Sequence, residues 1–232
     1  MAEDDFLDFK CPYCGLGVAY PEARVGVTEE CPGCFQTFIV PNPGDEKGRP
    51  LPLPIKTPSL VLRRFDAQDW EGVLEFASDE ELMRYGSFPP LDEESVVDWL
   101  TKDRSARFTE VSSGLWLGIE LVSAHKLIGG LWIGFQDDTR VQGSFWIVIN
   151  RQFHRKGYGT EATRALIDFW LHGLQAHRVT ASTDVENIAG RRLLEKAGLR
   201  REGEFIQDQL VNNEWVSTAY YALLASEYRR PG

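Results

Sequence analysis

The stretch Phe145–Thr160, FWIVINRQFHRKGYGT, decides the fold of this 232-residue chain. Its first five residues are apolar and largely β-branched or aromatic, which predicts a buried strand. Its last six residues are glycine-rich. After them, one helix face is predicted from apolar residues at i, i+3, i+4 and i+7, namely Ala162, Ala165, Leu166 and Phe169. The stretch therefore predicts a strand, a glycine loop and a helix N-terminus in succession.

Such an arrangement is typical of an anion site. Free backbone N–H groups converge at a helix N-terminus, where the helix dipole adds positive potential. Gly157 and Gly159 let the backbone approach a phosphate closely, and Arg155 and Lys156 add formal charge. The loop lacks the spacing of a Walker A loop and the full G-x-G-x-x-G of a dinucleotide fold, which excludes both. An ordinary strand–helix turn is the alternative.

A second block, Asp184–Leu199 (DVENIAGRRLLEKAGL), contains an Asn, a short helical pattern and Glu-Lys-x-Gly. With this block, the chain resembles the GNAT acetyltransferases, whose pyrophosphate loop reads [QR]-x-x-G-x-[GA]. His154 stands where that family has Gln or Arg. The resemblance covers about residues 59–228. The tail 213–228 is similar to the branch that acetylates ribosomal-protein N-termini.

The predicted order of elements is α+β, which agrees with a GNAT-type mixed, mostly antiparallel sheet flanked by helices. Asp66 and Asp92 (or Ser95) are predicted to start helices, and Gly198 to end one. A turn is predicted at Asp137-Asp138. Strands are predicted at 60–65, 115–122, 126–135, 178–182, 199–207 and 215–224, besides the strand that ends at Ile149.

Composition limits the classes of partner. The formal net charge is −10 and the pI is about 5.0, which disfavours nucleic acid and anionic membranes. No apolar stretch approaches the roughly 20 residues of a membrane helix. The acidic N-terminus lacks the basic region of a secretory signal. These features predict a cytoplasmic protein.

All four cysteines lie within the first 34 residues, as Cys11, Cys14, Cys31 and Cys34. The C-x₂-C-x₁₆-C-x₂-C spacing is typical of a zinc ribbon, because two knuckles present four thiolates to one Zn²⁺. Four ligands leave no open position, so the predicted zinc is structural. Disulfides and redox-active C-x₂-C motifs are the alternatives, and a cytoplasmic chain disfavours the first.

Composition also divides the chain. We predict a zinc-ribbon-like module at 1–41, a linker with six prolines at 42–58 (with Pro41 counted at its border), and a GNAT domain at 59–232. Residues 1–50 hold nine acidic and four basic side chains, so nucleic acid is a poor partner for the module. We expect a structural module or one that docks a protein partner.

The GNAT resemblance implies acetyl-CoA as the cosubstrate. It implies that the strand before the loop hydrogen-bonds the pantetheine and separates from the next strand near Val179, and that one backbone N–H polarises the acetyl carbonyl. Asn187 would bind pantetheine, although it also suits a helix N-cap. The residues expected to bind the cofactor are Ile147, Val148, Ile149, Arg155, Lys156, Gly157, Tyr158, Gly159, Thr160 and Asn187.

The resemblance also implies direct attack by a neutral amine on the thioester, with a base for the ammonium proton and an acid for the CoA thiolate. The family's usual acids are replaced by Leu194 and Gly190, which cannot donate a proton. The catalytic candidates are Glu120, Asp184 and Tyr221, with Glu202 and Tyr220 as alternatives. A packing role for the tyrosines and a solvated role for the carboxylates are the competing interpretations.

Two hypotheses for the function follow. The first is an N-acetyltransferase that acts on a primary amine, either a protein N-terminus or a small-molecule amine. The second is a non-catalytic acyl-CoA-binding adaptor whose zinc ribbon docks a partner. Turnover with a panel of amines favours the enzyme, and tight CoA binding without turnover favours the adaptor.

Overall fold

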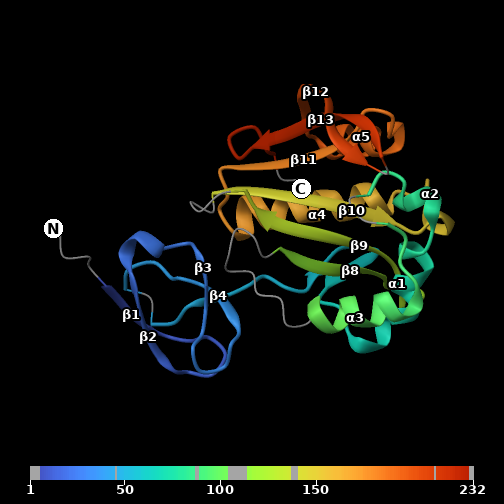
Figure 1. The fold of residues 1–232 in the computed structure, drawn as a ribbon. Helices are drawn as coiled ribbons and strands as arrows, with labels where there is room; N and C mark the ends of the chain where they lie inside the picture. Colours follow the sequence, from blue (N-terminus) through green and yellow to red (C-terminus); the bar gives the residue numbers. More distant parts are fainter. Residues whose placement is uncertain are drawn as a thin grey trace.

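A computed structural model describes residues 6–44, 46–86, 89–103, 114–136, 141–211 and 213–229. The cysteine-bearing N-terminal part forms a small separate lobe, drawn in blue in Figure 1. It contains two small sheets. β1 (Phe6–Lys10) pairs antiparallel with β2 (Gly17–Pro21), and the second sheet has the order β3 (Thr28–Glu30), β4 (Thr37–Ile39) and β5 (Arg49–Pro50). A 3-10 helix, Glu22–Arg24, lies between the two sheets in the chain.

An eight-stranded sheet forms the rest of the fold, in the order β12-β13-β11-β10-β9-β8-β7-β6. Neighbouring strands are antiparallel except β10 and β11, which are parallel. The mixed, mostly antiparallel α+β fold is therefore confirmed. The strands are β6 (Ile55–Lys56), β7 (Leu60–Arg63), β8 (Leu115–Leu121), β9 (Lys126–Phe135), β10 (Gln142–Ile149), β11 (Arg178–Asp184), β12 (Arg200–Val211) and β13 (Glu214–Leu224).

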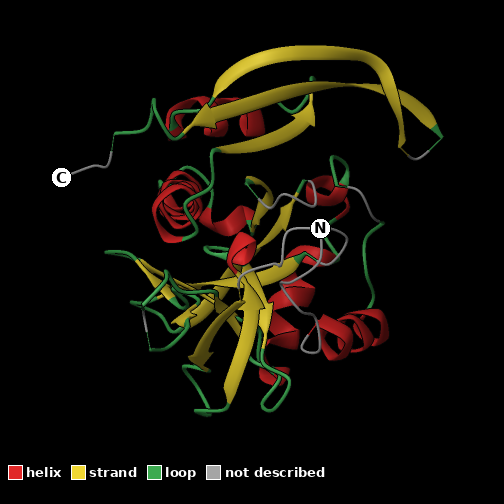
Figure 2. Ribbon diagram, turned by 90° about the vertical axis from the view of Figure 1, so that its left-hand side faces the viewer, coloured by secondary structure: helices red, strands yellow, loops and turns green. Residues whose placement is uncertain are grey.

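Helices cover both faces of this sheet, and the β12–β13 hairpin reaches out beyond it (Figure 2). The helices are α1 (Trp70–Ala77), α2 (Glu80–Met83), α3 (Glu93–Asp103), α4 (Tyr158–Asp168) and α5 (Ile188–Ala197), with 3-10 turns at Ala67–Asp69 and Arg151–Phe153 and a π-helical turn at Phe169–Gly173. Among the described residues, no helix combines the length and the apolar character needed to cross a membrane.

The two faces of β10 belong to two different cores. Phe145 and Ile149 pack in the cluster that contains α4. Val148 packs with residues of α1 and α3, and the partly buried Trp146 lies against the same cluster. This division follows from the period of two along a strand. It places α4 on one face of the sheet, and α1 and α3 on the other.

Local signals in the sequence act as expected. Asp66 accepts a hydrogen bond from the Gln68 N–H and forms a capping box with Asp69. Asp92 accepts from the Ser95 N–H just before α3. Gly198, with φ +108°, ends α5. These three predictions are confirmed. The turn predicted at Asp137-Asp138 lies outside the described residues.

The predicted linker contributes to the sheet. Leu51, Leu53 and Ile55 pack against the main core, and β6 pairs with β7. Just beyond the linker's strand, Glu161 on α4 accepts hydrogen bonds from the Thr57 hydroxyl at 2.6 Å and the Ser59 N–H at 2.8 Å. The division of the chain into domains stays a prediction, and the second half of the linker packs with the sheet.

Candidate functional site

The sheet opens between its two parallel strands. β10 and β11 pair over three residues only, from Gln142↔Arg178 to Ser144↔Thr180. β11 continues beside β13 as far as Asp184↔Thr218, so it leaves β10 together with the last hairpin. The two strands diverge toward the end that holds α2 and α5 (Figure 1). The predicted separation near Val179 is confirmed, since pairing ends one residue beyond Val179.

Alternation along β10 decides which backbone groups face this opening. The Asn150 N–H donates to the Ile128 carbonyl at 2.8 Å, and the Gln142 carbonyl accepts from the Gln136 N–H at 3.0 Å. Even-numbered residues therefore bond to β9, and odd-numbered residues turn their backbone groups toward β11. Ile147 and Ile149 face the opening as expected. Val148 directs its backbone toward β9, which does not support a backbone contact from it to the cofactor.

The glycine loop adopts an anion-binding form. Arg155 and Gly157 both have positive φ, +60° and +90°, and Gly157 is the N-cap of α4. The first N–H groups of a helix have no intrahelical partner, so those of Tyr158, Gly159 and Thr160 are available to an anion. A Cβ on Gly157 would meet no described atom within 4 Å. Its glycine is therefore required by the backbone conformation.

The second glycine of the loop has a different requirement. A Cβ on Gly159 would lie 2.7 Å from Cδ1 of Leu193, because α5 packs directly on the start of α4. Tyr158 is half-buried and packs against the main core. Lys156 places its ammonium 5.1 Å from the ring centre of Phe153 and stays exposed at the loop. The structure thus brings the predicted loop residues together around one helix terminus.

His154 closes the end of the open edge. Its Nε2 lies 2.7 Å from the Ile149 carbonyl oxygen, so the ring N–H donates to a carbonyl that faces the opening. At this position, where the GNAT motif has Gln or Arg, the side chain fastens the loop to β10. The departure from the motif therefore has a defined local function.

Asn187 is an N-cap in the structure. Its Oδ1 accepts from the Gly190 N–H at 2.9 Å, and its Nδ2 donates to the Thr183 hydroxyl at 3.1 Å. A Cβ on Gly190 would lie 2.7 Å from Nδ2 of Asn187, which explains the glycine. The capping interpretation is confirmed, and the cofactor role stays a prediction.

Asp184 and Tyr220 lie on the α1–α3 face of the opened region. Ser144 and Thr180 are the last partners, so Trp146, Ser182 and Asp184 follow on that same face by alternation. Tyr220 pairs with Ser182 and has its ring centre 4.7 Å from that of Phe205. Asp184 is half-buried, and its Oδ1 accepts from the Glu186 N–H at 2.7 Å.

Tyr221 lies on the opposite face. It is 1% exposed, belongs to the cluster that contains α4, and its hydroxyl donates to Glu195 on α5 at 3.2 Å. The structure therefore separates the two adjacent tyrosines and gives Tyr221 a packing environment. Sequence reasoning selected Tyr221, whereas Tyr220 shares a face with Asp184. Both residues are aromatic strand positions, so only the register of β13 distinguishes them.

Glu120 lies away from the opening, on β8, where it serves an ion-pair network. Its Oε2 accepts from Nε of Arg63 at 2.6 Å, and Arg63 also binds Asp69 at 2.7 Å. Hydrogen bonds to Asp69 and then Glu120 raise the pKa of Arg63. The alternative carboxylate Glu202 likewise forms ion pairs, with Arg178 and Arg200. Neither carboxylate shares the opened region with Asp184.

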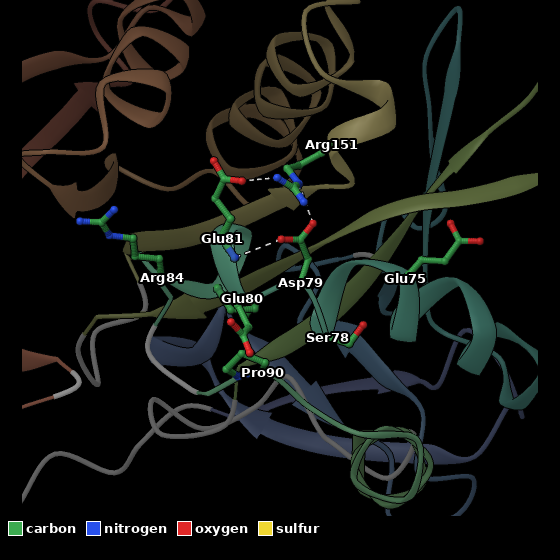
Figure 3. A pocket seen from close by; sticks show the side chains of 9 residues that line it. Glu75, Ser78, Asp79, Glu80, Glu81, Arg84, Pro90 and Arg151 are labelled. Atoms are coloured by element: carbon green, nitrogen blue, oxygen red, sulfur yellow. Dashed lines mark hydrogen bonds and ion pairs between the residues drawn. The ribbon is translucent and has the colours of Figure 1, made fainter.

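An acidic pocket lies where β10 ends, with a volume of about 910 Å³. Arg151, just after β10, forms ion pairs with Asp79 at 2.6 Å and with Glu81 (Figure 3). Asp79 also caps α2 by accepting from the Glu81 and Leu82 N–H groups. The lining residues are Glu75, Ser78, Asp79, Glu80, Glu81, Met83, Arg84, Pro90 and Arg151. The ion pairs fasten α2 to the end of β10.

The four cysteines converge as the spacing predicts. All four Sγ atoms lie within 4.8 Å of one another, with Cys11–Cys34 at 3.7 Å and Cys14–Cys31 at 3.6 Å. Four sulfurs about 2.3 Å from one Zn²⁺ in a tetrahedron lie about 3.8 Å apart, so the cluster fits this ion. The N–H groups of Tyr13 and Gly33 point at Cys11 and Cys31 Sγ, each at 3.4 Å, as knuckle turns require.

Comparison with known proteins identifies the family. The family model "Acetyltransferase (GNAT) domain" matches residues 59–200. A protein of Bacillus subtilis (strain 168), "Uncharacterized N-acetyltransferase YnaD", is 32% identical over 179 residues, which cover 75% of this chain and 98% of that protein. The family-model match begins at residue 59, after the cysteine module, where the predicted domain also begins.

Solved structures agree on the fold. A GNAT-family acetyltransferase from Bacillus anthracis superposes with a TM-score of 0.68 at 29% identity, covering 75% of this chain and 99% of the other. Spermidine N-acetyltransferase from Vibrio cholerae, solved with CoA and spermine, superposes with a TM-score of 0.63 at 18% identity, covering 74% and 98%. The second likeness supports the fold alone.

Proposed function

Because the chain belongs to the GNAT acetyltransferase family, we propose that it transfers the acetyl group of acetyl-CoA to a primary amine. The observation that carries this proposal is the open edge of β10 beside the N-terminus of α4. The edge offers backbone groups to an extended ligand, and the helix terminus offers N–H groups to its phosphates. A phosphate-bearing, extended cosubstrate fits both features at once.

The pyrophosphate binds at the loop. The N–H groups of the first turn of α4 donate hydrogen bonds to its oxygens, and Arg155 and Lys156 balance its charge. The pantetheine lies along β10, where Ile147 and Ile149 supply backbone groups. Asn187 lies at the start of α5 and adds an amide contact from the far side of the opening.

The chemistry is direct transfer. The amine nitrogen attacks the thioester carbonyl, an N–C bond forms, and the C–S bond breaks to release the CoA thiolate. A backbone N–H of β10 that faces the opening stabilises the oxyanion. All four cysteines lie in the N-terminal module, so the domain contains no thiol for an acyl-enzyme intermediate. The ammonium loses its proton before attack, and the thiolate gains one after it.

Asp184 is the predicted catalytic candidate that we retain as the base. It lies at the end of β11, on the face opposite α4, where an amine can reach the thioester without crossing the cofactor. The environments of Glu120 and Tyr221 favour structural roles. For the thiolate we propose Tyr220, which shares the face of Asp184.

The acceptor is a primary amine of a protein N-terminus or of a small molecule. The similarity of the tail to the ribosomal branch supports the first, and the acidic pocket beside β10 suits a cationic small amine. We further propose that Cys11, Cys14, Cys31 and Cys34 bind a structural Zn²⁺, which holds the two knuckles together and takes no part in the transfer.

Calorimetric titration with acetyl-CoA tests the proposal. Wild-type protein should bind in the micromolar range, and Gly157→Glu should weaken binding about tenfold or more, since it places a carboxylate at the phosphate site. Gly44→Glu is the matched control, because Gly44 has a similar φ of +92° with no described atom within 4 Å of its Cβ position. Its binding should equal that of the wild type.

A thiol-release assay with a panel of amines completes the test. Amine-dependent release of CoA supports the enzyme and identifies the acceptor class. Folded wild-type protein that does not bind acetyl-CoA overturns the proposal. Tight binding without turnover on any amine overturns the transfer step and returns the function to a binding protein.

A further inference from the structure

The opening between β10 and β11 can be reached from two faces of the sheet, and the cofactor and the amine use different ones. The phosphate loop and α4 lie on one face, with Ile149 packed among residues of α4. An extended cofactor therefore enters the opening from the α4 face. The amine must approach the thioester from the α1–α3 face, since the cofactor occupies the other. The side chains that line the opening on that second face select the acceptor.

Trp146 is the side chain of β10 at that position. It lies two residues beyond Ser144, the last residue of β10 that pairs with β11, and it points to the α1–α3 face. The corresponding residue of β11 is the exposed Ser182, two residues beyond Thr180. Trp146 is half-buried, whereas Val148, the next β10 residue on this face, is only 6% exposed.

An aromatic ladder holds Trp146 in place. Successive rings meet edge to face, with centres 5.3 Å apart for Phe65–Trp99, 5.3 Å for Trp99–Trp116 and 5.6 Å for Trp116–Trp146. The ladder runs from the end of β7 through α3 and β8 to β10. Edge-to-face packing of this kind fixes ring orientation. Trp146, on the edge of the opening, is therefore held by aromatic side chains of β8 and α3 on the same face of the sheet.

A glycine pair lets the ladder cross β9. Trp116 and Trp146 both pair with Trp132 of β9, yet their rings meet each other. This happens because the Trp132 indole lies flat along its own strand. A Cβ on Gly134 would fall 2.2 Å from Cη2 of Trp132, and one on Gly114 would fall 1.8 Å from its Nε1. The two glycines thus keep Trp132 out of the path between Trp116 and Trp146.

We propose that Trp146 determines acceptor specificity, by packing its indole on an apolar stem adjacent to the acceptor amine. This inference rests on the proposed acetyl transfer and names the acceptor class: a primary amine on an aryl-alkyl or alkyl stem. The wall offers carbon-rich rings and no charged side chain among its described members, Phe65, Trp99, Trp116 and Trp146. Removing water from the ammonium beside such a wall also favours its neutral, nucleophilic form.

Steady-state kinetics with graded amines tests this inference. The probes are ethylamine, butylamine, phenethylamine and spermidine, each with saturating acetyl-CoA. For wild-type protein, kcat/KM should rise from ethylamine to phenethylamine. Trp146→Ala should lower kcat/KM for phenethylamine by about tenfold or more, mainly through KM, and for ethylamine by about threefold or less. Trp146→Phe should retain most of the preference.

Controls separate a specific role from a structural one. Trp215→Ala removes an indole that is 61% exposed on β13, and it should leave the amine preference unchanged. Affinity of Trp146→Ala for acetyl-CoA should stay within about twofold of wild type. If Trp146→Ala does not fold, Trp146→Leu keeps an apolar side chain and removes the ring, and the same comparison of amines applies.

The outcomes are distinct. An equal fall in kcat/KM for all amines, or a wild-type preference for spermidine over phenethylamine, overturns the specificity role while leaving the acetyltransferase intact. Loss of acetyl-CoA binding by the wild type overturns the proposed function itself. A selective loss of the phenethylamine preference in Trp146→Ala, with the preference of Trp215→Ala unchanged, supports the specificity role of Trp146.

Discussion

The cysteine module and the acetyltransferase domain differ in the size and composition of their cores. The module's core is small, and two of its five buried members are the cysteines Cys11 and Cys31. The domain has an extensive core of leucine, isoleucine and aromatic residues where strands of the sheet meet α4 and α5 on one face, and a second core on the other face. A short segment with little apolar surface relies on a metal for its folding energy, whereas a large domain does not. The comparison predicts that each part responds to a different perturbation.

One short strand belongs to both cores. On β4, Phe38 is fully buried among the aromatic residues of the module, with its ring centre 5.6 Å from that of Phe9. The next residue, Ile39, is 2% exposed and lies in the core of the domain. Alternation along the strand sends neighbouring side chains in opposite directions. The module is thus joined to the domain by packing as well as by the chain.

Removing a proposed zinc ligand should have the largest effect. Cys31→Ser deletes a fully buried thiolate from a four-sulfur site. Zinc binding contributes on the order of 10 kcal/mol to the folding of such modules, so we expect the module to unfold. Metal analysis should fall from one zinc per chain to none, and amide exchange in β1–β4 should become fast. Amide protection in β8–β11 should persist.

The contrary result is equally clear. If Cys31→Ser unfolds the domain as well, the two parts form one cooperative unit and the comparison is wrong. If the wild-type protein contains no zinc after expression with added metal and yet protects β1–β4, the module folds by packing alone, and the metal proposal is wrong.

Substitutions on β4, the strand shared by the two cores, should have the second-largest effect on stability. Ile39→Ala should lower the free energy of unfolding of the domain by about 2–4 kcal/mol, because it leaves a cavity in the core. Phe38→Ala is the matched control on the same strand, and it should lower the stability of the module instead. Chemical denaturation monitored separately by zinc release and by tryptophan fluorescence distinguishes them. Identical shifts of both signals in both variants would show that β4 does not divide its side chains between two cores.

Much of the fold is readable in the sequence because its signals are local. The capping residues Asp66 and Asp92 and the terminating Gly198 each act within one turn of their helix. The cysteine spacing and the glycine loop are equally local, and both lead to the observed clusters. Residues 51–56 fall in the predicted linker because Pro50, Pro52 and Pro54 interrupt any regular pattern there. Their packing depends on a distant hydrophobic surface that a local pattern does not reveal.

The site is less predictable because its parts meet through strand register. The choice between Tyr220 and Tyr221 depends on which face of β13 each side chain takes, and both faces carry apolar neighbours. The aromatic ladder joins four segments far apart in the chain, ending at Trp146, and no periodicity reports it. Glu120 lies on a strand as predicted, but its partner Arg63 comes from β7, which the sequence alone does not pair with β8.

Two glycines with similar left-handed backbone conformations, one in each part of the chain, offer a test with a smaller expected effect. Gly157 in the domain and Gly15 in the module have φ of +90° and +76°, and neither has a described atom within 4 Å of its Cβ position. Alanine at either position should therefore cost about 1 kcal/mol through the backbone alone. Gly157→Ala should lower the domain's stability and weaken acetyl-CoA binding, whereas Gly15→Ala should weaken zinc retention only. A fall in acetyl-CoA affinity for Gly15→Ala would contradict this separation.

The smallest effect is expected at an ion pair of the domain. Glu120→Gln keeps the shape of the side chain and removes the charge that faces Arg63. Because both side chains are partly exposed, the free energy of unfolding should fall by only about 0.5–1 kcal/mol. Arg63 keeps its contact with Asp69, so β7 stays in place.

Asp184→Asn is the comparison variant, and it should lower kcat with little change in stability, since it removes the proposed base. A loss of kcat in Glu120→Gln that matches the loss in Asp184→Asn would place Glu120 in the proton path and overturn its structural role. An unchanged kcat in both would instead mean that transfer depends on positioning and the oxyanion contact, with solvent accepting the proton.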